Sequence, residues 1–191
     1  TKEGKIEEAK QALAESKRFS AMEKDAGLSA KACQTTASGP AMGTGNDFAG
    51  KTTGEEMKNG IRMQLCWIPA GKFTMGSSPD EPERNGGQEA QVEVELTHGF
   101  WLGKYEVTQE EYEKITGSNP SKFTEVGEKA PVDQVSWGEA VVFCEKLGER
   151  ERKRGKLPEG WSYSLPTEAQ WEYACRAGGK GLYAGGKLDE V

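Results

Sequence analysis

The sequence is poor in several features on which metal sites, membrane anchors and nucleic-acid surfaces depend. A single histidine in 191 residues excludes any metal site built from several histidines. No apolar run approaches the roughly 18 residues that a membrane span needs. Basic residues number 25 against 31 acidic residues, and the net charge of -6 argues against a general nucleic-acid binder. Hydrophobic residues still make up 35% of the chain, which is enough for one packed core.

Cysteines are few and widely spaced, at Cys33, Cys66, Cys144 and Cys175. None belongs to a C-x-x-C pair, so the pattern excludes a zinc ribbon and a small disulfide scaffold. A disulfide among the four stays open, because sequence spacing does not choose a pairing. Residues 2–31 are too polar for a secretory signal peptide, and the compartment is not predicted.

Aromatic residues divide the chain unevenly. All five tryptophans and all five tyrosines follow residue 60. Residues 1–33 are rich in Glu, Lys and Ala, which predicts a charged helical segment. Within residues 34–60, the stretch 34–54 is mostly Gly, Ser, Thr, Ala and Pro, which is typical of a flexible linker. We therefore expect the folded domain over residues 61–191.

Extended and helical signals both occur within this domain. Alternating or aromatic-rich runs predict four strands, over residues 61–68, 73–75, 91–97 and 100–107. Three capping boxes of the type S/T-x-x-E/Q predict three helix starts, at Thr108 with Glu111, Ser136 with Glu139, and Thr167 with Gln170. Strands followed by short helices and long loops indicate an α+β fold.

The two later helices each carry an apolar face. The second helix presents Ala140, Phe143, Cys144 and Leu147 at core-facing spacing. The third presents Trp171, Ala174 and Cys175, and we expect Gly178 to be its left-handed cap.

Candidate catalytic residues do not assemble into a constellation. Cys144 and Cys175 are predicted to be small buried hydrophobes, whereas the exposure of Cys66 stays open. His98 could act as a general base, but no partner residue is identifiable.

Acidic clusters also have structural explanations. Glu168 and Glu172 lie one turn apart, where roles at the helix terminus are favoured over paired-carboxylate catalysis. Residues 80–83 (DEPE) are predicted to be a solvated loop, and the mixed charges of residues 149–156 a helix end. The sequence therefore assigns no catalytic, cofactor-binding or metal-binding residue.

Four ordered motifs nevertheless resemble one known family. They are residues 67–77 (WIPAGKFTMGS), 100–109 (FWLGKYEVTQ), 131–137 (PVDQVSW) and 165–178 (LPTEAQWEYACRAG). Together they resemble the N-terminal portion of the formylglycine-generating enzyme, or sulfatase-modifying factor, family. Residues 1–60 are not covered by the resemblance.

The resemblance implies a C-type-lectin-like fold with little regular secondary structure. It also implies copper and calcium as metals of the complete domain, although not in this chain. The copper-binding cysteine pair and the calcium ligands of the family follow the last motif, so none of the four cysteines takes a catalytic role. Some relatives are copper-dependent oxidases that convert a sulfatase cysteine to Cα-formylglycine, and others are iron-dependent sulfoxide synthases.

Two functions follow from this resemblance. The first is a metal-dependent thiol oxidase in the parent protein, of which this chain supplies the N-terminal part. The second is a non-catalytic ligand- or protein-binding module on the same fold, as expected for many bacterial relatives without an assigned activity. The expected partners are a protein or peptide, such as a sulfatase or the C-terminal half of the domain. The half-domain is also expected to expose Trp137 and Trp171.

Overall fold

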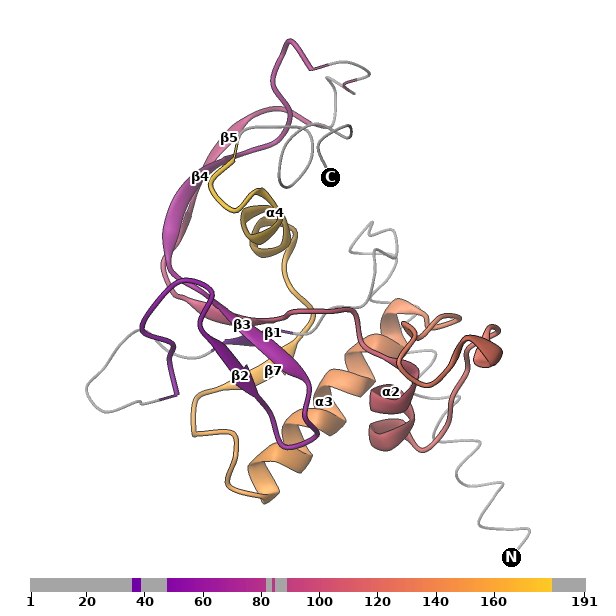
Figure 1. Cartoon of the computed structure of the whole chain (residues 1–191). Coiled ribbons are helices and arrows are strands. Elements are labelled where there is room, and N and C mark those ends of the chain that lie inside the picture. Colours follow the sequence, from indigo (N-terminus) through magenta and orange to yellow (C-terminus); the bar gives the residue numbers. More distant parts are fainter. Residues whose placement is uncertain (1–35, 39–47, 82–83, 85–88, 180–191) are drawn as a thin grey trace, which may run out of the picture.

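A computed structural model describes residues 36–38, 48–81, 84 and 89–179 (Figure 1). Within these residues, three α-helices and one short 3-10 helix, η1 (Thr124–Val126), accompany two antiparallel sheets. No helix in the described part is both long and apolar enough to cross a bilayer. The predicted helical segment 1–33 lies outside the described residues.

The larger sheet has five short strands in the order β2-β3-β6-β1-β7. Their bounds are β1 (Thr36–Ser38), β2 (Glu56–Lys58), β3 (Gln64–Ile68), β6 (Phe100–Gly103) and β7 (Ser162–Ser164). Trp67 pairs with Trp101, and Cys66 pairs with Leu102. Since side chains alternate along a strand, these two pairs lie on opposite faces of the sheet.

Several parts of the predicted linker, residues 34–60, belong to this folded unit, and strand β2, which pairs with β3, is one of them. Strand β1 pairs with both β6 and β7, and Thr36 is fully buried. Farther along, the backbone carbonyl of Phe48 accepts a hydrogen bond from the Trp101 indole at 2.8 Å. The Phe48 ring also contacts the Trp161 ring edge-on. The expectation that composition keeps this stretch unpacked is therefore wrong at these positions, because neighbouring tryptophans and strands supply the contacts that its own side chains lack. The division of the chain into three segments stays a prediction.

The smaller sheet pairs β4 (Gly71–Met75) with β5 (Val92–Leu96). Both strands follow the predicted runs closely. The other two predicted strands are shorter than expected, because β3 begins only at Gln64 and β6 ends at Gly103. Before β3, the Asn59 side chain accepts hydrogen bonds from the backbone of Ile61 and Met63, and this turn replaces extended backbone.

All three predicted capping boxes are present. Both reciprocal hydrogen bonds form at the starts of α2 (Gln109–Thr116), α3 (Trp137–Lys153) and α4 (Glu168–Arg176). Gly178 has the predicted left-handed conformation, with a φ of 83°, but Ala177, which is also left-handed, is the residue that caps α4. Each helix start is thus fixed by two or three residues of local sequence.

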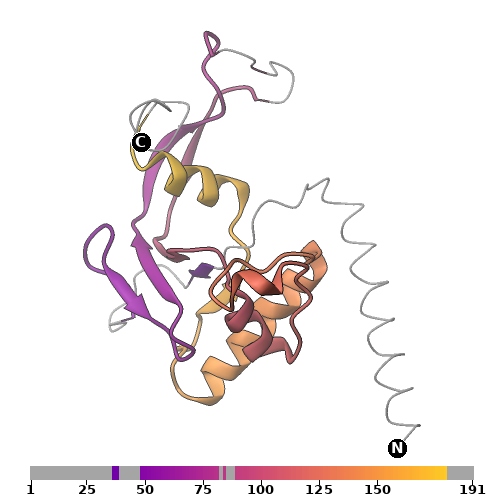
Figure 2. The same ribbon diagram turned by 45° about the vertical axis from the view of Figure 1, so that its right-hand side comes forward.

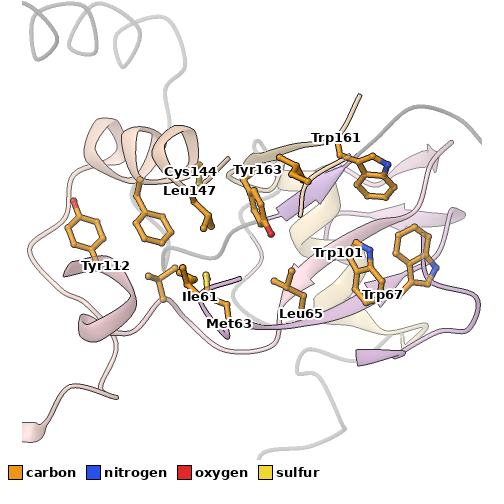
Figure 3. Packing of buried hydrophobic residues seen from close by; sticks show 13 residues of the cluster. Ile61, Met63, Leu65, Trp67, Trp101, Tyr112, Cys144, Leu147, Trp161 and Tyr163 are labelled. Atoms are coloured by element: carbon orange, nitrogen blue, oxygen red, sulfur yellow. The ribbon is translucent and has the colours of Figure 1, made fainter. Parts of the chain in front are cut away.

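Helices α3 and α4 lie on opposite sides of the five-stranded sheet (Figure 1 and Figure 2). Between α3 and the sheet lies the core, in which the predicted face of α3 is buried at Ala140, Phe143, Cys144 and Leu147. Three tryptophans gather at one end of this core, where Trp67 contacts both Trp101 and Trp161 (Figure 3). The α3 face of the sheet therefore carries most of the apolar burial.

Replacing a core residue of α3 tests this account of the core. Leu147 is fully buried, so Leu147→Ala should lower the free energy of unfolding by about 2–5 kcal/mol. Val126→Ala is the control, because that side chain is 63% exposed. Urea unfolding followed by tryptophan fluorescence measures both, and similar losses in the two variants would contradict the assignment of the core.

Candidate functional site

The face of the sheet that meets α4 contains a small hollow. Its volume is about 270 Å³. Strands β3 and β6 and the residue after β6 line it with Cys66, Ile68, Leu102, Gly103 and Lys104, and α4 lines it with Trp171, Ala174 and Cys175. Two thiols from separate elements therefore open onto one mostly apolar space.

The three described cysteines have different surroundings. Cys144 is 2% exposed, which confirms the prediction of a small buried hydrophobe. Cys175 is exposed, so the same prediction is wrong there, because the last turn of α4 borders the hollow instead of packed protein. Cys66 is half-buried, and none of these three cysteines forms a disulfide. Cys33 lies outside the described residues.

An ion pair adjoins the Cys66 thiol. Lys104 Nζ lies 2.6 Å from a carboxylate oxygen of Glu56, and this hydrogen bond raises the pKa of Lys104. Burial raises the pKa of the Cys66 thiol, and the charge of Glu56 raises it further, whereas the Lys104 ammonium opposes this rise. Cys66 is therefore less readily ionised than an ordinary thiol.

A charged clamp holds α4 against the smaller sheet. Glu172 accepts hydrogen bonds at 2.8 Å from the backbone N–H of Gly76 and from Arg176 Nε. Arg176 in turn donates to the carbonyl of Gly76 at 2.8 Å. Gly76 has a φ of 96°, a left-handed conformation that favours glycine. Side chains of α4 thus hydrogen-bond to both the N–H and the carbonyl of Gly76.

Close packing between β4 and α4 reinforces this clamp. The rings of Phe73 and Tyr173 lie 5.2 Å apart, and Gly71 leaves room for the Tyr173 hydroxyl where any Cβ would collide with it. Of the two glutamates singled out in the sequence, Glu168 is exposed in the first turn of α4, whereas Glu172 belongs to the clamp. The structure therefore gives them separate positions and not a shared catalytic pair.

A second hollow, of about 500 Å³, opens where the last turn of α3 meets the β2–β3 turn. Glu151 is 1% exposed there, and one of its oxygens accepts the Gly60 N–H at 2.7 Å. Burial raises the pKa of the nearby Tyr163 hydroxyl, Asn59 opposes this rise, and the charge of Glu151 adds to it.

The role of Glu151 was missed within the charged run 149–156, which was predicted only to be the end of the second helix. Its spacing from Phe143 and Leu147, four residues at each step, was the available signal.

The other candidates from the sequence stay separate. His98 is exposed, and its ring bonds to the neighbouring Thr97 hydroxyl. Asp80 is exposed, and residues 82–83 lie outside the described part. Trp137 and Trp171 are half-buried, so the prediction that they are exposed is wrong. Among the described residues, the exposed large hydrophobic side chains are Val92, Tyr105, Phe123 and Val126.

The chain offers a matched test of the clamp. Glu172→Ala removes the acceptor of two hydrogen bonds and leaves the three-quarters-buried Arg176 side chain without its carboxylate partner. The free energy of unfolding should fall by about 1–3 kcal/mol. Glu149→Ala breaks another i,i+4 pair, with Lys153, but both of those side chains are mostly exposed, and about 0.5 kcal/mol is expected. Chemical unfolding of both variants measures the difference, and equal losses would show that the clamp adds nothing.

Comparison with known proteins gives a family and several relatives. Residues 51–191 match the family of sulfatase-modifying factor enzyme 1-like domains. A protein of Paenibacillus barcinonensis named chaperone protein LppX is 34% identical in an alignment 106 residues long, which covers 42% of this chain and 37% of that protein. The formylglycine-generating enzymes of Mus musculus and Bos taurus are each 27% identical in an alignment 161 residues long, which covers 58% of this chain and 39% of theirs.

A solved structure shares the fold. PvdO from Pseudomonas aeruginosa superposes with a TM-score of 0.56 at 24% identity, over 70% of this chain and 55% of that one. The chain thus spans little more than a third of the curated relatives' length and about half of PvdO. Its α+β architecture of short strands and few helices is the C-type-lectin-like fold of the formylglycine-generating enzyme type. The chain belongs to the sulfatase-modifying factor enzyme 1-like family, to which the four sequence motifs pointed.

Proposed function

We propose that the protein to which this chain belongs is a formylglycine-generating enzyme, which oxidises a cysteine side chain of a protein substrate to Cα-formylglycine. The family match over residues 51–191 is the observation that carries this proposal. Two curated relatives with that name support it, at 27% identity over 161 residues.

Within this proposal, the described residues act as the scaffold of the domain. The core between α3 and the sheet and the clamp between α4 and β4 fix the two faces of β3 and β6. Copper and calcium are the metals that the family implies. Among the described residues, no three His, Cys, Asp or Glu side chains come together as metal ligands. The resemblance places the copper-binding cysteine pair and the calcium ligands of the family after the last motif, residues 165–178, so neither metal and no step of the reaction is assigned to the described residues.

A second candidate is a binding module that engages an unmodified protein or peptide. One observation favours it, namely that the relative named as a chaperone protein is 34% identical, more than either formylglycine-generating enzyme. On this alternative, the fold presents a partner surface and no thiol is oxidised.

Assaying the whole protein encoded by the gene beside the 191-residue chain separates the two candidates. Each is incubated with a sulfatase-derived cysteine peptide under air, and mass spectrometry with a hydrazide probe detects the aldehyde. We expect the whole protein to form the aldehyde and the 191-residue chain to form none, because the resemblance places the copper-binding cysteine pair of the family after the last motif, residues 165–178.

The control is a peptide in which serine replaces the cysteine, since no thiol is then available for oxidation. Aldehyde formation by the 191-residue chain would contradict the scaffold role. Peptide binding by the whole protein without any aldehyde, after loading with copper, would replace the oxidase proposal with the binding module.

A further inference from the structure

The hollow beneath α4 joins two free thiols that neither proposed function uses. We propose that Cys66 and Cys175 are a redox-active thiol pair, which a small disulfide compound such as oxidised glutathione converts to an intramolecular disulfide that links β3 to α4. Both residues line the same hollow of about 270 Å³, and both are free. This inference concerns a covalent modification of the scaffold and does not depend on the oxidase proposal.

The register of the sheet directs Cys66 toward α4. Leu65 and Trp67, its neighbours in β3, are buried on the α3 side, so Cys66 lies on the other face. Its cross-strand partner Leu102 lines the same hollow. On α4, Cys175 follows Trp171 by four residues, and both border the hollow. The two thiols therefore approach one space from the sheet and from the helix.

The walls of this space are mostly apolar. Ile68, Leu102 and Ala174 line it, and Lys104 is the one charged residue among its lining residues. A disulfide requires the two Cβ atoms to come within about 4.5 Å. The clamp ties α4 to Gly76, the residue after β4, so we expect a disulfide that draws α4 toward β3 to draw the end of β4 with it.

Differences in access set the order of the reaction. Cys175 is exposed, so its thiolate attacks one sulfur of oxidised glutathione first, forms a mixed disulfide and releases one glutathione thiolate. The Cys66 thiolate then attacks the Cys175 sulfur and expels the second glutathione thiolate. Two protein thiols are oxidised, one glutathione disulfide is reduced to two thiols, and the protons pass to solvent. Burial and the charge of Glu56 raise the pKa of Cys66 more than the Lys104 ammonium lowers it, so this second step becomes faster as the pH rises.

The test uses the 191-residue chain with Cys33→Ser, which removes the one cysteine outside the described residues. The protein is treated with oxidised glutathione, and its intact mass is measured without reductant. We expect the loss of two hydrogens with no adduct, and peptide mapping should find Cys66 linked to Cys175. Cys144, which is 2% exposed, should stay reduced and serves as the internal control.

Two variants in the same background separate the roles of the thiols. In Cys66→Ser, the reaction should stop at one glutathione adduct on Cys175. In Cys175→Ser, glutathione should attach to Cys66 at least ten times more slowly than it attaches to Cys175 in Cys66→Ser. Circular dichroism confirms that both variants remain folded. A mixed disulfide that persists when both cysteines are present, a link to Cys144, or no reaction at all would each overturn the proposal.

Discussion

Burial of one face of α3 against the five-stranded sheet is the contact on which the rest of this structure depends. Phe143 and Leu147 of α3 are fully buried in this core, and Leu65 of β3 is fully buried in the same core from the side of the sheet. Each of these side chains contributes roughly 1.5–3 kcal/mol when it leaves water. This packing fixes β3 and β6 in register, and the register decides which residues face α4 on the other side of the sheet.

The second face is held more by polar contacts than by apolar burial. No residue of α4 is buried, and the Glu172–Arg176 clamp on Gly76 supplies its best-defined attachments. The hollow beside Cys66 and Cys175 lies on this side. The molecule therefore combines a close-packed core on one face with an accessible thiol-lined space on the other. This division is consistent with a scaffold whose α4 face is available for modification or partners.

The sequence predicted local features, such as the helix starts, more completely than contacts between residues that are far apart in the chain. Three capping boxes located every described α-helix start, because each box depends on residues within four positions of one another. The spacing of apolar residues on α3 likewise identified its buried face. The family and its fold followed from four motifs with fixed residues, which specify more than hydrophobic periodicity does.

What the sequence could not reveal depends on distant partners. Residues 36–38 form strand β1 because they pair with β6 on one side and β7 on the other. Nothing in the composition of residues 34–54 indicates this position in the sheet. The exposure of Cys175 reflects the hollow under α4, which periodicity along one helix cannot show. The clamp joins residue 76 to residues 172 and 176, which lie 96 and 100 positions farther along the chain.

The packing of α3 on one face of the sheet should be more stable than the attachment of α4 on the other, and native-state hydrogen exchange tests this difference most directly. Backbone amides of α3, β3 and β6 should exchange only through global unfolding, whereas amides of α4 should exchange through a smaller local opening. Equal protection of α3 and α4, or faster exchange in β3 and β6 than in α4, would contradict it.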